Sequence, residues 1–437
     1  MNSPSFEQHI GIYTYYTRPA GIGGKLRRIP EDFRVIERFS YPPKKDQGRF
    51  TIAEVSSVNW ETHTLVGELA TRLHVSEQRI EFAGTKDKRA VTTQLMSFFN
   101  IPVEKLQNVR LKDVQISNVY TADQPVRIGD LAGNTFDILI RMLDKTVTEH
   151  EIDSLISPIQ TLKGFPNYYG IQRFGIIRPI THLVGRAIIN GDFEQAVMTY
   201  IANPMPEEPG EIKTLRQHLA STHDFSAALE QYPNSLNFEK MMLRTLVKNP
   251  KDFIGALQAL PKNLLMLFIS AYQAFLFNKI LSERIRQDIS LDSAMLGDRV
   301  FPVRNSIVDA ETIIPVQPSN IDKVNQQLQK KRAVLTGALF GSDTPIADGI
   351  MGDIEQQVYD NEKITPRDFI IADIPFLSSS GARRALLAFV DPITWTLTSD
   401  DLQKGKQALR LQFFLQKGCY ATCLLRELMK SPDPRDY

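Results

Sequence analysis

The chain has 437 residues, of which 42% are hydrophobic and 23% are charged, a composition that excludes intrinsic disorder as the main state and predicts a substantial buried core. Its 51 lysines and arginines balance 50 aspartates and glutamates, and the resulting formal charge of +1 excludes a uniformly basic protein that coats nucleic acid. Only two cysteines occur, which excludes a disulfide-rich secreted fold.

The first half of the chain alternates between strand-like segments and leucine repeats typical of helices. Strands are predicted over 33–37, 80–83, 114–120 and 135–142. Helices are predicted over 62–73, where leucine recurs every four residues behind Thr62 as the N-cap, and over 149–162. A glycine turn at 84–88 follows the second strand.

The second half has a different character, which we interpret as a separate domain. From about residue 193 to 286 helical periodicity dominates, interrupted by a proline-rich linker at 203–210, and 315–375 is rich in turn residues. Further strands are predicted over 295–314, 385–390 and 407–415, and further helices over 322–332 and 421–430.

Charge is unevenly distributed along the chain. The segment 24–50 holds eight lysines and arginines against four aspartates and glutamates, whereas the offsetting acids are predicted to lie largely in 207–211 and 343–362. A polyanionic partner is therefore expected to bind one face, with an affinity that falls as salt rises.

The termini and apolar runs predict neither export nor membrane insertion. The N-terminus shows no basic stretch followed by an apolar run, so we expect no signal peptide. The longest candidate span, 264–277, has 14 residues and falls short of the roughly 20 that a bilayer requires. We expect a soluble, cytoplasmic protein.

Several common catalytic motifs are absent. The chain has no phosphate-binding loop, dinucleotide fingerprint, zinc-protease helix or serine-esterase elbow, and its seven histidines are scattered. This argues against nucleotide hydrolysis, dinucleotide redox chemistry, zinc hydrolysis and serine-esterase chemistry.

Two segments carry residues that suit chemistry on a nucleotide. Asp87 stands between Lys86, Lys88 and Arg89, so its ionised form should be favoured, as a nucleophile or electrostatic stabiliser requires. A solvated charged turn is the alternative. The aromatic run at 164–175 suits a stacking platform for an extruded base, or else a loop anchored by aromatic packing.

Five segments, in order along the chain, resemble the motifs of the TruD family of tRNA pseudouridine synthases. They are Pro-Glu-Asp-Phe-x-Val-x-Glu at 30–37, Phe-Ala-Gly-Thr-Lys-Asp-Lys-x-Ala-x-Thr-x-Gln at 82–94, Pro-Asn-Tyr-Tyr-Gly-x-Gln-Arg-Phe-Gly at 166–175, Ser-Ala-Tyr-Gln-Ala-Phe-Leu-Phe-Asn at 270–278 and Gly-Cys-Tyr-Ala-Thr-x-Leu-Leu-Arg-Glu-Leu at 418–428. The resemblance makes the solvated-turn alternative for Asp87 much weaker. The fourth motif and the length of the second domain resemble archaeal or eukaryotic-type members.

The resemblance implies an α+β fold. Residues 1–192 and 388–437 would form a discontinuous pseudouridine-synthase catalytic domain, with a mixed, mostly antiparallel sheet and flanking helices. Residues 193–387 would form the inserted α/β domain that distinguishes this family.

The implied activity is isomerisation of uridine to pseudouridine, at uridine 13 of tRNA, with the target base flipped out of its stack. Asp87 would be the nucleophile, by attack on C1′, by attack on C6 or through a glycal, and the sequence does not choose among these routes. No cofactor or metal is expected.

The other implied site residues surround this nucleophile. Arg27 would be its basic partner, with Lys25 as an alternative, and Tyr169 would stack on the uracil. The remaining expected substrate contacts are Phe33, Lys86, Asn167 and Tyr420.

The expected partner is tRNA, with other RNAs left open, no membrane and a monomeric state. The alternative function is a non-catalytic RNA-binding protein or RNA chaperone that keeps the fold. An eroded catalytic motif would indicate it, but Lys86, Asp87 and Gln94 are all present.

Overall fold

The computed structural model describes residues 2–86, 88–206, 208–304, 307–390, 392–433 and 436–437. The chain divides into two compact units. The eight-stranded unit comprises residues 17–165 and 388–437, and the helix-rich unit comprises residues 1–16 and 166–387.

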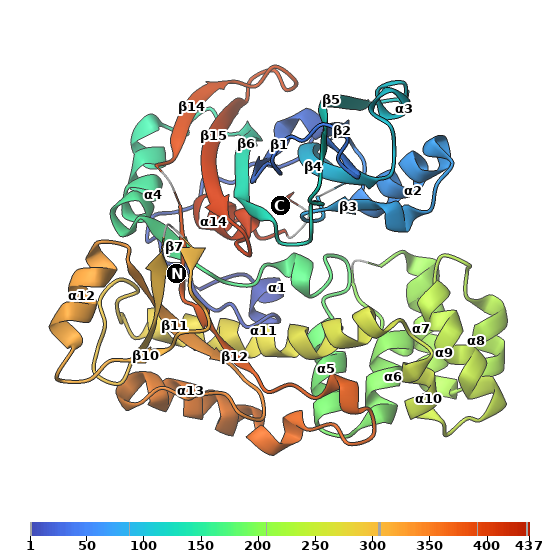
Figure 1. Cartoon of the computed structure of the whole chain (residues 1–437). Coiled ribbons are helices and arrows are strands. Elements are labelled where there is room, and N and C mark those ends of the chain that lie inside the picture. Colours follow the sequence, from blue (N-terminus) through green and yellow to red (C-terminus); the bar gives the residue numbers. More distant parts are fainter. Residues whose placement is uncertain (1, 87, 207, 305–306, 391, 434–435) are drawn as a thin grey trace. The chain divides into compact units, whose positions relative to one another are not determined.

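The eight-stranded unit is built on one mixed sheet (Figure 1). Its strands, in spatial order, are β14 (Thr394–Ser399), β15 (Gln407–Gln416), β6 (Leu131–Leu143), β1 (Phe33–Phe39), β4 (Val91–Phe99), β2 (Phe50–Val58) and β5 (Val114–Ala122), with β3 (Ile80–Phe82) paired to β4. Strands β1 and β4 run parallel, and the other described pairings in this sheet are antiparallel. This confirms the expected α+β class with a mixed, mostly antiparallel sheet.

Burial along the strands follows from their sequences. In β1, Phe33, Val35 and Glu37 are buried while the residues between them are exposed, which is the alternation of a half-buried strand. The helices of this unit are α2 (Thr62–Leu73), α3 (Val103–Gln107), α4 (Glu149–Leu162) and α14 (Ala421–Met429). The leucine repeat of α2 packs against apolar residues of β2 and β4 in one core.

Helix α2 has the predicted bounds but a different N-cap. The cap is Glu61, whose carboxylate accepts a hydrogen bond from the backbone N–H of Thr64 at 2.9 Å. Thr62, the predicted cap, instead accepts a hydrogen bond through Oγ1 from the backbone N–H of Lys86 at 2.8 Å. The start of this helix therefore supports the loop that follows β3.

The helix-rich unit combines a helical bundle with a smaller antiparallel sheet (Figure 1). Its helices are α1 (Ser5–Gln8), α5 (Thr181–Ile189), α6 (Phe193–Ala202), α7 (Gly210–Thr222), α8 (Phe225–Gln231), α9 (Asn237–Lys248), α10 (Phe253–Gln258), α11 (Lys262–Arg286), α12 (Ile321–Gln329) and α13 (Gly349–Glu362). Its strands are β8 (Arg299–Arg304), β9 (Ile307–Val308), β10 (Ile314–Pro315), β11 (Ala333–Leu339) and β12 (Ala382–Ala385). The remaining strands β7 (Gly164–Pro166) and β13 (Leu387–Phe389) pair with each other, and each contains a division point of the chain.

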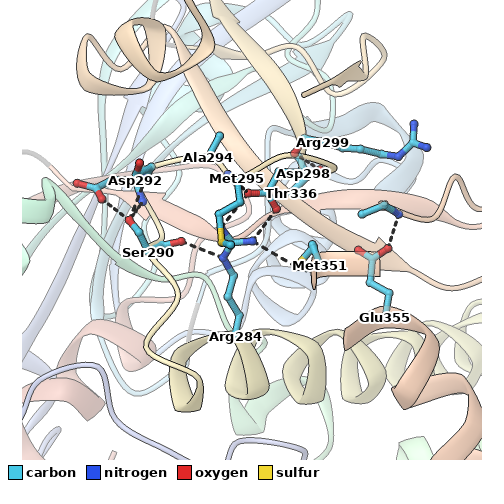
Figure 2. Close-up of polar contacts among 12 residues, drawn as sticks. Arg284, Ser290, Asp292, Ala294, Met295, Asp298, Arg299, Thr336, Met351 and Glu355 are labelled. Carbon is cyan, nitrogen blue, oxygen red and sulfur yellow. Dashed lines mark hydrogen bonds and ion pairs between the residues drawn. The ribbon is translucent and has the colours of Figure 1, made fainter. Parts of the chain in front are cut away.

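Helix α11 is the central element of the helix-rich unit. It spans 25 residues, rather than the 14 of its most apolar stretch, and among the described residues it is the one helix long and apolar enough to cross a membrane. However, 61% of its apolar window is buried inside the protein, as in the core helix of a soluble protein. Near its end, Arg284 makes a buried bidentate ion pair with Asp298, at 2.7 and 3.0 Å, and donates to the carbonyl of Ser290 (Figure 2). This pair ties α11 to the segment that enters β8.

The stretch 315–375, which is rich in turn residues, contains the predicted helix as α12 and also the central strand β11 and helix α13, which were not predicted. Six of the seven residues of β11 are buried, so the strand lacks the alternation that identifies a one-sided strand in a sequence. The acidic residues of α13 also misled the prediction, because Glu355 is fully buried and paired with Arg383 at 2.7 Å. The two errors have different causes: β11 is buried on both faces, whereas α13 has an exposed side and a buried side, and its buried side includes acidic residues.

The compact units divide the chain before 166 and after 387, and residues 1–16 group with the helix-rich unit. The predicted catalytic domain, 1–192 with 388–437, and the predicted inserted domain, 193–387, stay predictions. Helix α5 belongs to the helix-rich unit because it packs closely on α11: a Cβ on Gly185 would lie 2.0 Å from the carbonyl oxygen of Phe268. The N-terminal segment is held by α11 as well. The backbone N–H of Tyr13 donates to Ser282 at 3.1 Å, and Asn278 donates to the carbonyl of Ile10 at 2.9 Å.

Candidate active site

The loop between β3 and β4 contains Asp87, which lies outside the described residues. Both flanks of this loop are hydrogen-bonded to neighbouring segments. The bonds run from Gly129 N–H to the Ala83 carbonyl at 2.8 Å, from Lys86 N–H to Thr62 Oγ1 at 2.8 Å, and from Asn59 N–H to the Ala90 carbonyl at 2.9 Å. The described residues on both sides of position 87 are therefore held by two separate parts of the eight-stranded unit, the connection between β2 and α2 and the segment at Gly129.

Lys86 is held in a buried ion pair. Its ammonium lies 2.5 Å from the carboxylate of Glu37 on β1, and the two side chains are 4% and 0% exposed. The other carboxylate oxygen of Glu37 accepts from the backbone N–H of Leu95 at 3.4 Å. Burial raises the pKa of Glu37, and the nearby Lys86 ammonium opposes this shift. The pair thus joins the first motif to the second, at a desolvation cost.

Gln94 of the second motif lies next to this pair. Strands β1 and β4 are paired as far as Ile36 and Thr93, so Glu37 and Gln94 are the next residues along and share one face of the sheet. Gln94 is 1% exposed, and no hydrogen-bond partner for its Oε1 is found among the described residues. Glu37 of the first motif and Lys86 and Gln94 of the second motif therefore lie close together, next to the loop between β3 and β4.

Arg27 is connected to the same loop. Its guanidinium carbon lies 4.0 Å from the ring centroid of Phe33, and its backbone carbonyl accepts a hydrogen bond from Arg89 at 3.1 Å. Its φ of 53° is unusual for a residue with a side chain. The alternative partner, Lys25, has its ammonium 3.5 Å from the carboxylate of Asp436. Arg27 is thus linked to the loop through its backbone and Arg89, and Lys25 is paired with Asp436; which of the two is the basic partner of Asp87 stays a prediction.

Phe33 and Tyr420 also lie in the eight-stranded unit. Phe33 is 1% exposed, and its ring meets that of Phe136 edge to face, with the ring centroids 6.1 Å apart. The Phe136 ring stacks on Phe413, with the centroids 5.3 Å apart. Tyr420 is half-buried and occupies the N-cap position of α14. The structure therefore brings Phe33 together with Arg27. The predicted nucleotide contacts of Phe33 and Tyr420 stay predictions.

Asn167 and Tyr169 lie in the helix-rich unit, where the chain leaves β7. Asn167 is buried, and its amide nitrogen donates to the carbonyl of Ala385 at 2.9 Å. Tyr169 is half-buried, and its backbone N–H and carbonyl both bind the side-chain amide of Asn278, at 2.8 and 3.0 Å. The third motif is therefore held by the fourth, because Asn278 is the last residue of that motif on α11.

Three positions near the predicted site residues were missed as individual sites. Glu37 and Asn278 lie inside the first and fourth motifs, so the motif match already contained a signal for them. Arg384, which contacts both Asn167 and Tyr169, lies in no motif. Arg384 follows Arg383 on a short strand, and two neighbouring arginines offer no pattern from which the contacts of either could be predicted.

The basic segment 24–50 is more unbalanced at the surface than in the sequence. Seven of its eight cations are exposed, and the eighth, Arg27, is half-buried. Two of its four anions are buried in ion pairs, Glu37 with Lys86 and Asp32 with Arg141. The surface of this segment therefore carries seven exposed cations and two exposed anions, a balance that suits binding to a phosphate backbone.

The acids predicted to offset this segment are partly internal. Glu208 is buried against Arg216 at 2.9 Å, and Glu362 lies 2.5 Å from the ammonium of Lys279. Glu207 of the same predicted set lies outside the described residues. Within the described ranges, no three His, Cys, Asp or Glu side chains come together as a metal site.

Comparison with known proteins identifies the family. A profile described as tRNA pseudouridine synthase D (TruD) matches residues 9–428. Proteins from Methanosarcina barkeri (strain Fusaro) and Halobacterium salinarum (strain R1), both named "Probable tRNA pseudouridine synthase D", are 41% and 34% identical, each over 98% of both chains. A crystal structure from Methanosarcina mazei with the same family description is 39% identical, with a TM-score of 0.90 over 100% of both chains. These relatives are archaeal, in agreement with the expected subtype, and the chain belongs to the tRNA pseudouridine synthase D (TruD) family.

Proposed function

We propose that this protein isomerises uridine to pseudouridine at position 13 of tRNA, with Asp87 as the nucleophile and the target base flipped out of its stack. The reaction breaks the bond between C1′ and N1 and forms a bond between C1′ and C5. The proton lost from C5 balances the one gained at N1, so the isomerisation requires neither an oxidant nor a reductant. Attack at C1′, attack at C6 and loss of the C2′ proton all begin from the ionised carboxylate.

One observation carries the proposal: the loop that contains Asp87 is anchored on both flanks and linked by Arg89 to Arg27. A nucleophile gains most from being held in place before the substrate arrives, since ordering it during the reaction would raise the barrier. Arginine keeps its charge at any physiological pH, so Arg27 would keep a neighbouring carboxylate ionised.

The aromatic residue expected to hold the extruded base is also supported by fixed neighbours. Flipping a base out of its stack costs a few kcal/mol, which stacking on a ring partly restores. Tyr169 is half-buried, and its backbone is bound on both sides by Asn278. A ring with a fixed backbone can offer a face to the uracil at a low entropy cost.

The proposal is tested with purified protein and an unmodified tRNA transcript in the presence of EDTA. We expect pseudouridine at position 13 with the wild type, and none with Asp87→Asn although the variant still binds tRNA. A transcript carrying cytidine at position 13 should yield no pseudouridine.

Each part of the proposal has its own contrary outcome. Normal turnover by Asp87→Asn would overturn the nucleophile, and pseudouridine at another position would overturn the substrate assignment. A wild type that binds tRNA tightly and modifies nothing would favour the non-catalytic RNA-binding alternative.

A further inference from the structure

Two consecutive arginines on β12 have different environments. Arg383 faces the interior, where its guanidinium binds the carboxylate of Glu355 at 2.7 Å and both side chains are 0% exposed. Arg384 is half-buried and binds Asn167 instead. Successive residues of a strand point to opposite faces, so the sheet separates the two arginines into an internal role and a role beside the third motif.

Arg384 sets the orientation of the Asn167 side chain. Its Nη2 donates to Oδ1 of Asn167 at 2.7 Å, and its Nε donates to the Asn167 backbone carbonyl at 3.2 Å. The amide nitrogen of Asn167 donates to the carbonyl of Ala385 at 2.9 Å. An amide has two N–H donors and one oxygen with two lone pairs. These contacts leave the Asn167 side chain with one further N–H donor and one further lone pair on its oxygen, and they fix which of the two lies on which side.

The same guanidinium contacts Tyr169. Its carbon lies 4.0 Å from the centroid of the Tyr169 ring and 5.7 Å from that of Phe277. The Tyr169 and Phe277 rings meet edge to face at 5.8 Å. A guanidinium is flat, so it can donate hydrogen bonds in its plane while its face lies over an aromatic ring. A lysine ammonium has no such plane.

We propose that Arg384 is a positioning residue for the target base, which it controls through Asn167 and Tyr169. This inference rests on the proposed function. Uracil presents an acceptor, O4, beside a donor, N3–H, whereas cytosine presents the reverse order at the same edge. An amide that could turn over would fit either edge, but Arg384 and Ala385 hold it in one orientation. Arg384 therefore sets both the position of the stacking ring and the order of groups that reads the base.

The experiment is a double-mutant cycle with Asn167. Arg384→Met and Arg384→Lys are made in the wild type and in Asn167→Ala, and single-turnover pseudouridine formation, tRNA affinity and melting temperature are measured. We expect Arg384→Met to lower the rate about 100-fold, the effect of a misplacement near 1 Å, with tRNA affinity and melting temperature little changed. In Asn167→Ala the same change should cost much less, because residues in one network are not additive.

Control variants separate positioning from stability and from surface charge. Arg383→Met breaks a buried ion pair and should lower the melting temperature, and Arg244→Met removes an exposed arginine of α9 and should change neither rate nor melting temperature. Arg384→Lys keeps the charge without the fork, so it should lose rate as well, and it serves as the test if the Met variant does not fold.

Three outcomes would overturn the inference: unchanged rates in both Arg384 variants, losses that add fully to those of Asn167→Ala, or a loss of tRNA affinity with a weaker salt dependence. The last would show that Arg384 contacts a phosphate directly. A wild type that forms no pseudouridine contradicts the proposed function instead. An active wild type with indifferent Arg384 variants contradicts only the inference.

Discussion

Lys86 in one group of predicted site residues and the backbone of Tyr169 in the other are held by different kinds of interaction. In the eight-stranded unit, the Asp87 loop is held by the buried ion pair between Lys86 and Glu37. In the helix-rich unit, the amide of Asn278 holds the backbone of Tyr169 through neutral hydrogen bonds. Charge therefore helps to hold Lys86, whereas the backbone of Tyr169 is held without it. The two units should therefore respond differently to the loss of a side chain and to pH.

The largest expected effect on stability is at Lys86. Lys86→Met leaves Glu37 buried without a counter-ion, and we expect a loss of about 3–5 kcal/mol in the free energy of unfolding. The double variant Lys86→Met, Glu37→Leu removes both charges and should regain most of that loss. Denaturant unfolding measures both. A double variant as unstable as the single one would show that the charge itself does not determine the cost.

A smaller loss is expected at Asn278 in the helix-rich unit. Asn278→Ala removes the hydrogen bonds to backbone groups of Tyr169 and Ile10, and we expect a cost of about 1–3 kcal/mol. Asn278→Asp retains an acceptor for Tyr169 N–H and should lose less if its carboxyl takes up a proton. Unfolding of this variant should depend on pH, whereas that of Asn278→Ala should match the wild type in its pH dependence.

The pH dependence of Glu37 should be smaller again. Burial raises its pKa above the unfolded value, so its contribution to stability is present below that value and is lost as pH rises through the folded pKa. From about pH 4.3 upward, the wild type should therefore lose stability relative to Glu37→Gln. Melting temperatures of both proteins across this range measure the difference. A constant difference would contradict the raised pKa.

The smallest effect is expected at Lys25, whose side chain is 46% exposed and pairs with Asp436 at 3.5 Å. Lys25→Met should cost less than about 1 kcal/mol, as for other exposed ion pairs. Its pseudouridine formation should stay near that of the wild type, whereas Arg27→Met should lose most activity. The reverse order of rates would make Lys25 the basic partner of Asp87.

Local patterns correctly predicted much of the eight-stranded unit. Helices α2 and α4 have the predicted bounds because their apolar repeats follow the helical period and their ends carry suitable residues. Strand β11 and helix α13 were missed, because a strand buried on both faces and a helix with buried acids do not show the usual periodicity. The prediction failed where burial did not follow residue polarity: β11 is buried on both faces, and the buried side of α13 includes Glu355 and Glu362.

The candidate site shows the same division. The five motifs by themselves determined the family and which residue types are available, because each motif is a contiguous run that can be matched without its neighbours. Only the tertiary structure decided which partners the motif residues bind: Glu37 binds Lys86, Tyr169 binds Asn278, and Asn167 binds Arg384, which lies outside the motifs. These partners lie 49, 109 and 217 positions apart. Contacts at such separations depend on how the sheets and helices pack, which no local run of residues specifies.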